Sequence, residues 1–240
     1  MFPGTVMLLN LPLMDTDSPA VLNRLRGLRH IALDMDGTLY RGGTLFPFTN
    51  AVLARFTALG IGYSFVTNNC SKSADDYAQH LDRMGIISNA GRVHTAGHAT
   101  LACLRSEFPQ VRRVFLLGTP SLAAEFNAAG YTLTADSASD APDAIVAAYD
   151  PALTWDRLGR AAHWLRQGLP FLATHPDLVC PTDLPTVLLD CGAMCAALTA
   201  ATGRKPDAIP GKPDPRMLLG LCQNLGLRPD EIAMIGDRLY

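Results

Sequence analysis

The feature that most constrains this chain is a series of short apolar runs that end abruptly in polar residues. The first run is Ile31–Leu33 and the second is Ile61–Val66. Between them, apolar residues recur at helical spacing over 50–59, and Gly60 closes the pattern. A strand, a helix and a second strand at this spacing predict a right-handed βαβ unit with parallel strands.

The end of the chain repeats this pattern, and the middle carries strands of its own. A helical pattern over 214–225 is followed by an apolar run at 232–235. Three further strands are expected at 114–117, 144–147 and 171–173, with helices at 121–129 and 154–166 between them. We therefore predict an α/β protein in which a parallel-sheet core is interrupted by an inserted α/β domain. The predicted bounds are 18–90 and 204–240 for the core and 91–203 for the insertion.

Composition excludes several classes of protein. Hydrophobic residues make up 48% of the 240 residues and charged residues 18%, with a formal net charge of -2. An intrinsically disordered chain needs fewer apolar residues and a larger net charge. Binding to nucleic acid or to an anionic membrane surface needs clustered Lys and Arg, which this chain lacks. We expect neither kind of partner.

The distribution of cysteines and apolar segments indicates a cytoplasmic protein. The six cysteines are scattered through apolar stretches, as buried thiols in a reducing compartment would be. The apolar run 6–14 has no basic residue before it, as a secretory signal would require, and 184–201 contains Asp190, which argues against a membrane span.

Two residue pairs have the spacing of metal ligands on a helix. Cys191 and Cys195 are four apart, but no second Cys or His pair lies near them in the sequence. His94 and His98 are also four apart, with Thr95 where a zinc protease helix has Glu. We interpret both pairs as structural, and the two histidines as helix-surface or domain-junction residues.

Polar residues at the strand ends carry the chemistry, because ligands of open parallel sheets bind beyond the carboxyl ends of the strands. They are Asp34 and Asp36 after the first strand, Thr67, Asn68 and Asn69 after the second, Lys212 before a helix, and Asp237 after the last strand. Taken singly, these acids could be turn residues, the threonine a helix cap and the lysine a surface charge. Together they supply a nucleophile, donors for phosphate oxygens and ligands for Mg²⁺, which phosphoryl transfer requires.

Four segments, in order, resemble the motifs of the haloacid dehalogenase superfamily. They are Asp34-Met35-Asp36-Gly37-Thr38-Leu39, Thr67-Asn68-Asn69, Gly211-Lys212-Pro213 and Gly236-Asp237-Arg238-Leu239. The insertion between the second and third motifs is similar to the family's type II cap, and the core to its Rossmann-like fold. The second and third motifs resemble those of subfamily IIA, which includes NagD-like nucleotide phosphatases, 4-nitrophenylphosphatases, and phosphoglycolate and pyridoxal phosphate phosphatases.

This resemblance implies a role for each matching position. Asp34 would be the nucleophile, Asp36 the general acid and base, and Lys212 the residue that orients Asp34. The implied Mg²⁺ ligands are Asp34, the backbone carbonyl of Asp36, and Asp237. The implied substrate and phosphate contacts are Gly37, Thr67, Asn68, Asn69 and, in the cap, Asp150 and Asp177, for which a turn role is equally open. The resemblance also implies a homodimer built through the cap.

One departure from the family pattern concerns the fourth motif. In the family, a further acid follows five positions after Asp237, and this chain stops at Tyr240. We expect the C-terminal end of the core to be truncated. The sequence therefore predicts a Mg²⁺-dependent phosphatase of small phosphomonoesters such as nucleotides, sugar phosphates or phosphoglycolate. The alternative is a catalytically impaired binding or regulatory module with the same fold.

Overall fold

The structure is a computed structural model that describes residues 18–180 and 186–237. The apolar run 6–14 and residues Arg238 and Leu239 of the fourth motif lie outside the described residues. The chain divides into two compact units. The first comprises 1–66, 78–94 and 218–240, and the second comprises 67–77 and 95–217. The domain bounds predicted from the sequence stay a prediction.

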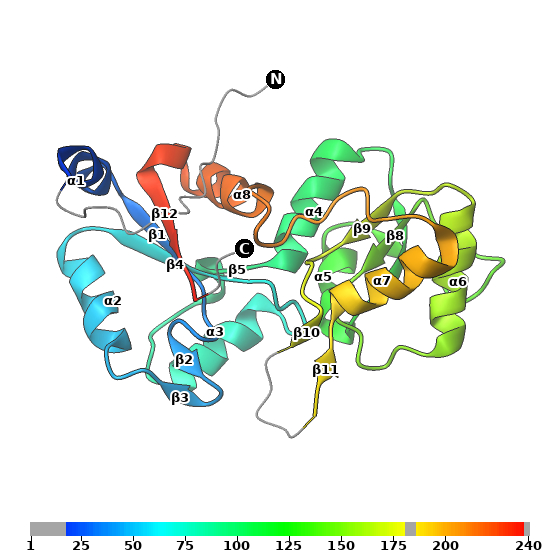
Figure 1. Cartoon of the computed structure of the whole chain (residues 1–240), viewed down its shortest axis with the longest axis horizontal. Helices are drawn as coiled ribbons and strands as arrows, with labels where there is room; N and C mark the ends of the chain where they lie inside the picture. The colour runs from blue at the N-terminus through cyan, green and yellow to red at the C-terminus, as the bar shows by residue number, and fades with distance from the viewer. Residues whose placement is uncertain (1–17, 181–185, 238–240) are drawn as a thin grey trace. The chain divides into compact units, whose positions relative to one another are not determined.

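The first unit is built around a parallel sheet with the strand order β12-β1-β4-β5. Its elements, some of which extend into the second unit, are α1 (Pro19–Arg26), β1 (His30–Leu33), β2 (Tyr40–Arg41), β3 (Thr44–Leu45), α2 (Thr49–Ala58), β4 (Gly62–Thr67), α3 (Ala74–Arg83), the 3₁₀ turn η1 (Ala90–Arg92), β5 (Val93–Thr95), α8 (Arg216–Leu225), the 3₁₀ turn η2 (Pro229–Glu231) and β12 (Ile232–Ile235). Strands β1 and β12, from opposite ends of the chain, lie side by side (Figure 1).

The position of β1 explains why apolar residues run without interruption from Ile31 to Leu33. His30 pairs with Ile232 of β12 on one side and with Gly62 of β4 on the other, both in parallel register. All four residues of β1 are buried. A strand covered on both faces and paired on both edges reads as a continuous apolar run, not as an alternation. The polar residues that follow it therefore lie at the carboxyl edge of the sheet.

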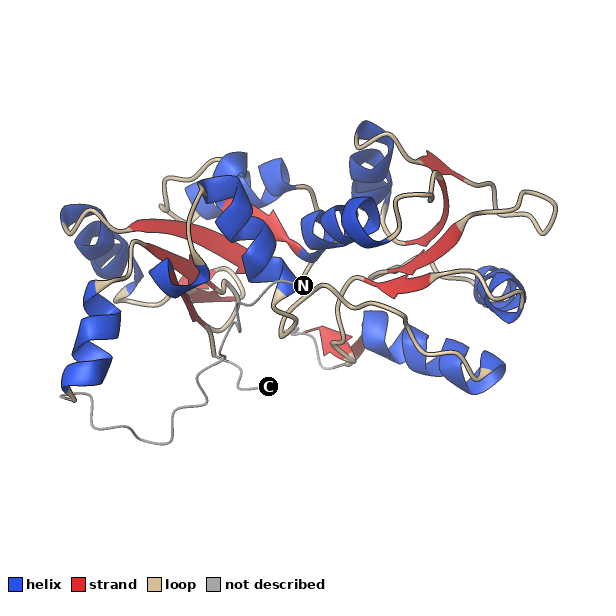
Figure 2. Ribbon diagram, turned by 90° about the horizontal axis from the view of Figure 1, so that it is seen from above, coloured by secondary structure: helices blue, strands red, loops and turns tan. Residues whose placement is uncertain are grey.

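The second unit contains another parallel sheet, with the order β7-β6-β8-β9. Its elements are α4 (Ala96–Glu107), β6 (Arg113–Leu117), α5 (Pro120–Ala128), β7 (Thr132–Leu133), β8 (Ala144–Ala147), α6 (Trp155–Arg166), β9 (Phe171–Ala173), β10 (Val179–Cys180), β11 (Leu188–Leu189) and α7 (Cys191–Thr202). Strands β10 and β11 form a separate antiparallel pair. Figure 2 shows helices on both faces of the four-stranded sheet.

Side chains that alternate along β6 contribute to two apolar layers, one on each face of the second sheet. Val114 and Leu116 pack in one cluster with residues of α4 and α5, including Phe126. Phe115 and Leu117 pack in the other with residues of α6 and α7. Because successive side chains of a strand point to opposite faces, one strand contributes to both layers. Each large side chain buried in this way stabilises the unit by roughly 1.5–3 kcal/mol.

The predicted strands at 144–147, 171–173 and 232–235 are β8, β9 and β12. A capping box precedes α3, since Ser73 Oγ accepts from the Asp76 N–H and the Asp76 carboxylate accepts from the Ser73 N–H. The prediction of an α/β fold with parallel sheets is confirmed. No helix among the described residues is long and apolar enough to cross a membrane.

The histidines are predicted to be helix-surface or domain-junction residues, and the second alternative fits, because the boundary between the two units falls directly after His94. His94 is buried in strand β5, whereas His98 lies in the first turn of α4. There the His98 side chain and the Thr95 hydroxyl complete a capping box. A spacing of four residues therefore spans a strand-to-helix boundary here, because Thr95 ends one element and caps the next.

Candidate active site

One group of predicted site residues lies in the turn that follows β1. The Asp34 N–H donates to the Ile235 carbonyl at 2.8 Å, so the ladder between β1 and β12 continues to this residue. The Asp34 side chain is buried, and its Oδ1 accepts from the Met35 N–H at 2.8 Å. Asp36 is exposed. The two acids therefore leave the same strand end, one held in the sheet edge and the other facing solvent.

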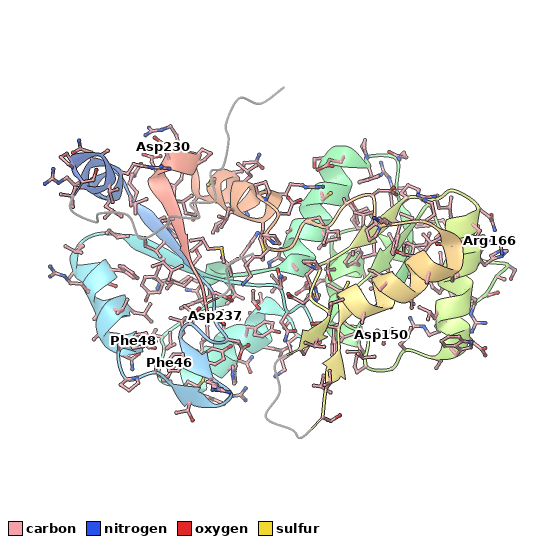
Figure 3. The ribbon with its side chains drawn as sticks, in the orientation of Figure 1. Phe46, Phe48, Asp150, Arg166, Asp230 and Asp237 are labelled. Carbon is pink, nitrogen blue, oxygen red and sulfur yellow. The ribbon has the colours of Figure 1, made fainter. Side chains whose placement is uncertain are left out.

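Two glycines allow a third carboxylate to approach. Gly37 has φ +81°, and a Cβ on it would overlap the Asp237 carboxylate. Gly236 lies against Asp34, because a Cβ there would be 3.5 Å from Asp34 Oδ2. Asp237 follows the end of β12 (Figure 3). The structure therefore brings Asp34, Gly37 and Asp237 together at one edge of the first sheet.

Tyr40 also belongs to this group of residues, although no sequence pattern predicted it. The Tyr40 hydroxyl hydrogen-bonds to the Asp36 side chain, and Tyr40 is 2% exposed. Burial, followed by the charges of Asp36 and Asp34, raises the pKa of Tyr40. The hydroxyl is therefore a proton donor to a carboxylate at neutral pH. A tyrosine four residues after an acid has no sequence signature that would have revealed this contact.

Another group of predicted site residues lies in the second unit, around Asn68. Its Oδ1 accepts from the Lys212 N–H at 2.7 Å, and its Nδ2 donates to the Lys212 carbonyl at 2.9 Å. The same Nδ2 also donates to Asp177 Oδ2 at 3.0 Å. The Asn68 side chain thus links the second motif to the third and to Asp177. Any contact that Asn68 makes with phosphate therefore falls to its backbone.

Close backbone packing holds this region together. A Cβ on Gly211 would overlap the Thr174 carbonyl and lie 2.9 Å from Asn68 Oδ1, so only glycine fits before Lys212. Lys212 is 6% exposed. Thr67 accepts from the Asn69 N–H at 3.1 Å through its hydroxyl oxygen. The structure thus brings Thr67, Asn68, Asn69, Lys212 and Asp177 into one region of the second unit.

Asp150, which the resemblance assigns to the substrate, is held by the fold of the second unit (Figure 3). Its side chain is 1% exposed and pairs with Arg157 at 2.7 Å. Its Oδ1 accepts from the Ala152 N–H at 3.0 Å, which is the hydrogen bond of a turn. Arg157 also donates to the Leu116 carbonyl at 2.9 Å. The carboxylate therefore joins the loop after β8 to α6.

A buried ion pair that no sequence pattern predicted lies near Asp177 in the chain. His175 Nε2 lies 2.9 Å from Asp190 Oδ1, and both side chains are buried. Burial alone would lower the pKa of His175, but hydrogen bonds from its neighbours, first of all Asp190, hold the pKa well above its ordinary value. Burial would conversely raise the pKa of Asp190, and the hydrogen bond to His175 lowers it instead. Both shifts favour the ionised form of the pair.

Cysteine thiols surround this pair. Cys180 donates to Asp190 Oδ2 at 2.9 Å, and burial followed by this hydrogen bond raises the pKa of Cys180. The Cys191 and Cys195 sulfurs are 4.0 Å apart. The hydrogen bond from Cys195 lowers the pKa of Cys191 to about 6, against the effect of burial. These thiols are free, in agreement with the cysteine pattern of the sequence.

Comparison with known proteins identifies the family. Residues 31–132 match the model of the haloacid dehalogenase-like hydrolases. The acid sugar phosphatase of Staphylococcus saprophyticus is 30% identical over 205 residues, which cover 85% of this chain and 77% of the relative. The chain belongs to the haloacid dehalogenase-like hydrolases.

Solved structures agree with this assignment. A 4-nitrophenylphosphatase from Thermotoga maritima has a TM-score of 0.83 at 37% identity, over 90% of this chain and 81% of that one. A glycerol phosphate phosphatase from Mycobacterium tuberculosis, in complex with magnesium, has a TM-score of 0.80 at 30% identity, over 89% of this chain and 63% of that one. The predicted membership of the subfamily that includes the 4-nitrophenylphosphatases is confirmed, and this chain is an enzyme of the phosphatase type.

Proposed function

We propose that this chain is a Mg²⁺-dependent phosphatase that hydrolyses small phosphomonoesters through an aspartyl-phosphate at Asp34. The observation that carries the proposal is the gathering of Asp34, Asp36 and Asp237 at the carboxyl ends of β1 and β12. This edge of an open parallel sheet is where such folds bind ligands.

The donor set fits Mg²⁺ by its chemistry. Asp34, the Asp36 carbonyl and Asp237 would hold the ion with oxygen atoms alone, and Mg²⁺ is usually bound by one or two carboxylates together with phosphate and water. Across 18–180 and 186–237, no group of three or more His, Cys, Asp or Glu side chains could hold a metal ion, so a site built from side chains alone is not the one proposed. When bound, Mg²⁺ supplies positive charge that offsets the charge of the carboxylates and the phosphoryl group.

Asp34 and Asp36 divide the reaction between them. Asp34 attacks phosphorus through one carboxylate oxygen, and the bond from phosphorus to the leaving oxygen breaks. Asp36, when protonated, gives its proton to that leaving oxygen. In the second step Asp36 takes a proton from water as the water attacks phosphorus, which releases phosphate and restores Asp34. The Met35 N–H, bonded to Asp34 Oδ1, orients the nucleophile for this attack.

Residues of the second motif, together with the Gly37 turn, are proposed to bind the phosphate of the substrate. Family motifs assign the Thr67 hydroxyl, the Asn68 and Asn69 backbone and the Gly37 turn to phosphate, and assign Lys212 to Asp34. The bonds from Asn68 to Lys212 and Asp177 support this assignment, because they order the segment that carries these donors. We propose that Asp177 contacts the rest of the substrate. If Asp150 has the same role, its carboxylate must bind the substrate in place of Arg157.

The substrate class follows from the relatives that the chain resembles. Their names specify an acid sugar phosphatase, a 4-nitrophenylphosphatase and a glycerol phosphate phosphatase. We therefore propose a small phosphorylated metabolite as the substrate. The catalytically impaired module is not favoured, because these relatives are phosphatases. The homodimer and the cytoplasmic location stay predictions.

The test is phosphate release from 4-nitrophenyl phosphate, with Mg²⁺ and with EDTA, by the wild type and by Asp34→Asn. We expect activity that requires Mg²⁺ and falls by about 10³-fold or more in the variant, since loss of a nucleophile removes the covalent route. Asp75→Asn, which changes an exposed acid of α3, is the matched control and retains activity. Activity that persists in Asp34→Asn would exclude the aspartyl-phosphate mechanism.

A further inference from the structure

The turn after β1 folds Tyr40 back onto Asp36. The Leu39 N–H donates to the Met35 carbonyl at 2.9 Å, and the Gly37 N–H donates to the Tyr40 carbonyl at 2.9 Å. The bond between Gly37 and Tyr40 belongs to an isolated β-bridge between Asp36 and Tyr40. These backbone interactions thus fix the path of the chain between these two residues. The approach of the Tyr40 side chain to Asp36 is a property of the fold at this turn.

The two partners differ in their freedom to move. Tyr40 is 2% exposed, pairs with Leu45 in the β2–β3 hairpin, and meets the His80 ring edge to face at 5.6 Å. Asp36 is exposed to solvent, where a short carboxylate samples several rotamers. A hydrogen bond from the immobile Tyr40 hydroxyl to Asp36 therefore restricts the acid to one orientation.

We propose that Tyr40 is the positioning residue of Asp36: its buried hydroxyl holds one carboxylate oxygen of Asp36 so that the other faces the leaving group. This inference rests on the proposed phosphatase reaction and adds to it the device that aims the general acid. In the first step the proton moves from the second Asp36 oxygen to the leaving oxygen as the P–O bond breaks. The Tyr40 hydroxyl keeps its own proton throughout.

The leaving group separates this role from a merely structural one. 4-Nitrophenolate is a stable anion and leaves phosphorus with little help from an acid, whereas an alkoxide requires a proton in the transition state. A misaimed Asp36 therefore slows hydrolysis of an alkyl phosphate far more than hydrolysis of 4-nitrophenyl phosphate. Loss of packing would lower both rates by the same factor.

The experiment compares kcat/KM for glycerol phosphate and 4-nitrophenyl phosphate in the wild type and in Tyr40→Phe. Both kcat/KM values report the step in which the leaving group departs. We expect the ratio of alkyl to nitrophenyl activity to fall about 10-fold or more in the variant, a part of the effect of general acid catalysis. Because each ratio is taken on one preparation, a smaller folded fraction cancels from it.

Tyr63→Phe is the matched control, since it removes a hydroxyl from β4, where the ring contacts Phe65 and Arg92. It leaves the ratio unchanged. In an Asp36→Asn background, Tyr40→Phe has no further effect on the ratio, because its target is gone. Tyr40→His, which keeps a ring N–H donor of shorter reach, provides a second variant and restores part of the ratio.

Two results would overturn the inference: an equal change in both activities in Tyr40→Phe, or an effect on the ratio that persists without the Asp36 carboxylate. Failure of the proposed function has a different signature. In that case the wild type hydrolyses neither ester with Mg²⁺, and both proposals are lost together.

Discussion

The two units use the acids that follow their strands in different ways. In the second unit, Asp150 pairs with Arg157 at 2.7 Å and Asp190 with His175 at 2.9 Å. In the first unit, the Met35 N–H contacts Asp34 and the Tyr40 hydroxyl contacts Asp36 at the end of β1.

This difference concerns what each contact does. An acid paired with a cation in the interior joins two elements of the fold, and removing one partner leaves the other charge uncompensated. The Met35 N–H and the Tyr40 hydroxyl instead orient the Asp34 and Asp36 carboxylates at the end of β1. The partner of an acid at a strand end, together with its position, therefore indicates its role.

The largest effect that would test this comparison is the loss of stability in Asp190→Asn. The change leaves the His175 imidazolium buried without its counter-charge, and we expect the free energy of unfolding to fall by about 3 kcal/mol. Asp34→Asn, which abolishes activity, is expected to change it by less than about 1 kcal/mol. Urea denaturation followed by circular dichroism measures both. Similar losses in the two variants would remove the distinction between the units.

A smaller loss of stability is expected for Asp150→Asn. This variant tests whether Asp150 stabilises the fold or binds the substrate. The Arg157 side chain is 24% exposed, so we expect a loss of about 2 kcal/mol in unfolding free energy, with KM unchanged. Arg157→Gln should cost a similar amount, and the double variant little more than either, because both act on one pair. A raised KM in Asp150→Asn with full stability would instead assign Asp150 to the substrate.

The smallest effect is a pH dependence of stability carried by His175. Its pKa in the folded protein is raised above the ordinary 6.5, so the folded state keeps the proton that the unfolded chain releases as the pH rises. The stabilisation is complete below pH 6.5 and is lost above it, by at most about 1.4 kcal/mol per pH unit. Unfolding free energies between pH 5.5 and 8 measure this slope.

The control for the pH prediction is Asp190→Asn, in which the pKa of His175 is no longer raised by a carboxylate. We expect its unfolding free energy to lack this decline above pH 6.5. Groups near the pair that also interact electrostatically with it are Cys70, Cys180 and Cys191. A decline of equal slope in the variant would show that another group is responsible.

Local pattern predicted most of the secondary structure, and the exceptions have physical reasons. Strands β8, β9 and β12, and β1 after His30, are short continuous apolar runs, which are typical of parallel sheets. Helix α4 was not predicted. Seven of its twelve residues, Ala96, Gly97, Ala99, Thr100, Leu101, Cys103 and Leu104, are buried. A helix covered on most of its surface has no alternation of apolar and polar faces to reveal it.

The residues of the candidate site that directly follow strands could be predicted from the sequence. Asp34, Asp36 and Asp237 could be found because an acid directly after a buried run must emerge at the sheet edge. The structure determined the contacts of Asn68 with Lys212, which is 144 residues away in the sequence. It also determined the contacts of His175 and Tyr40, because neither histidine after a strand nor tyrosine in a turn has a pattern of its own.

The sequence by itself determined the family, the parallel strands and the acids at their ends. Each of these depends on a pattern of residues that are neighbours along the chain. Only the tertiary structure decided which groups each acid contacts. Ion pairs and hydrogen bonds depend on groups brought within about 3 Å by packing, and no local pattern contains that distance.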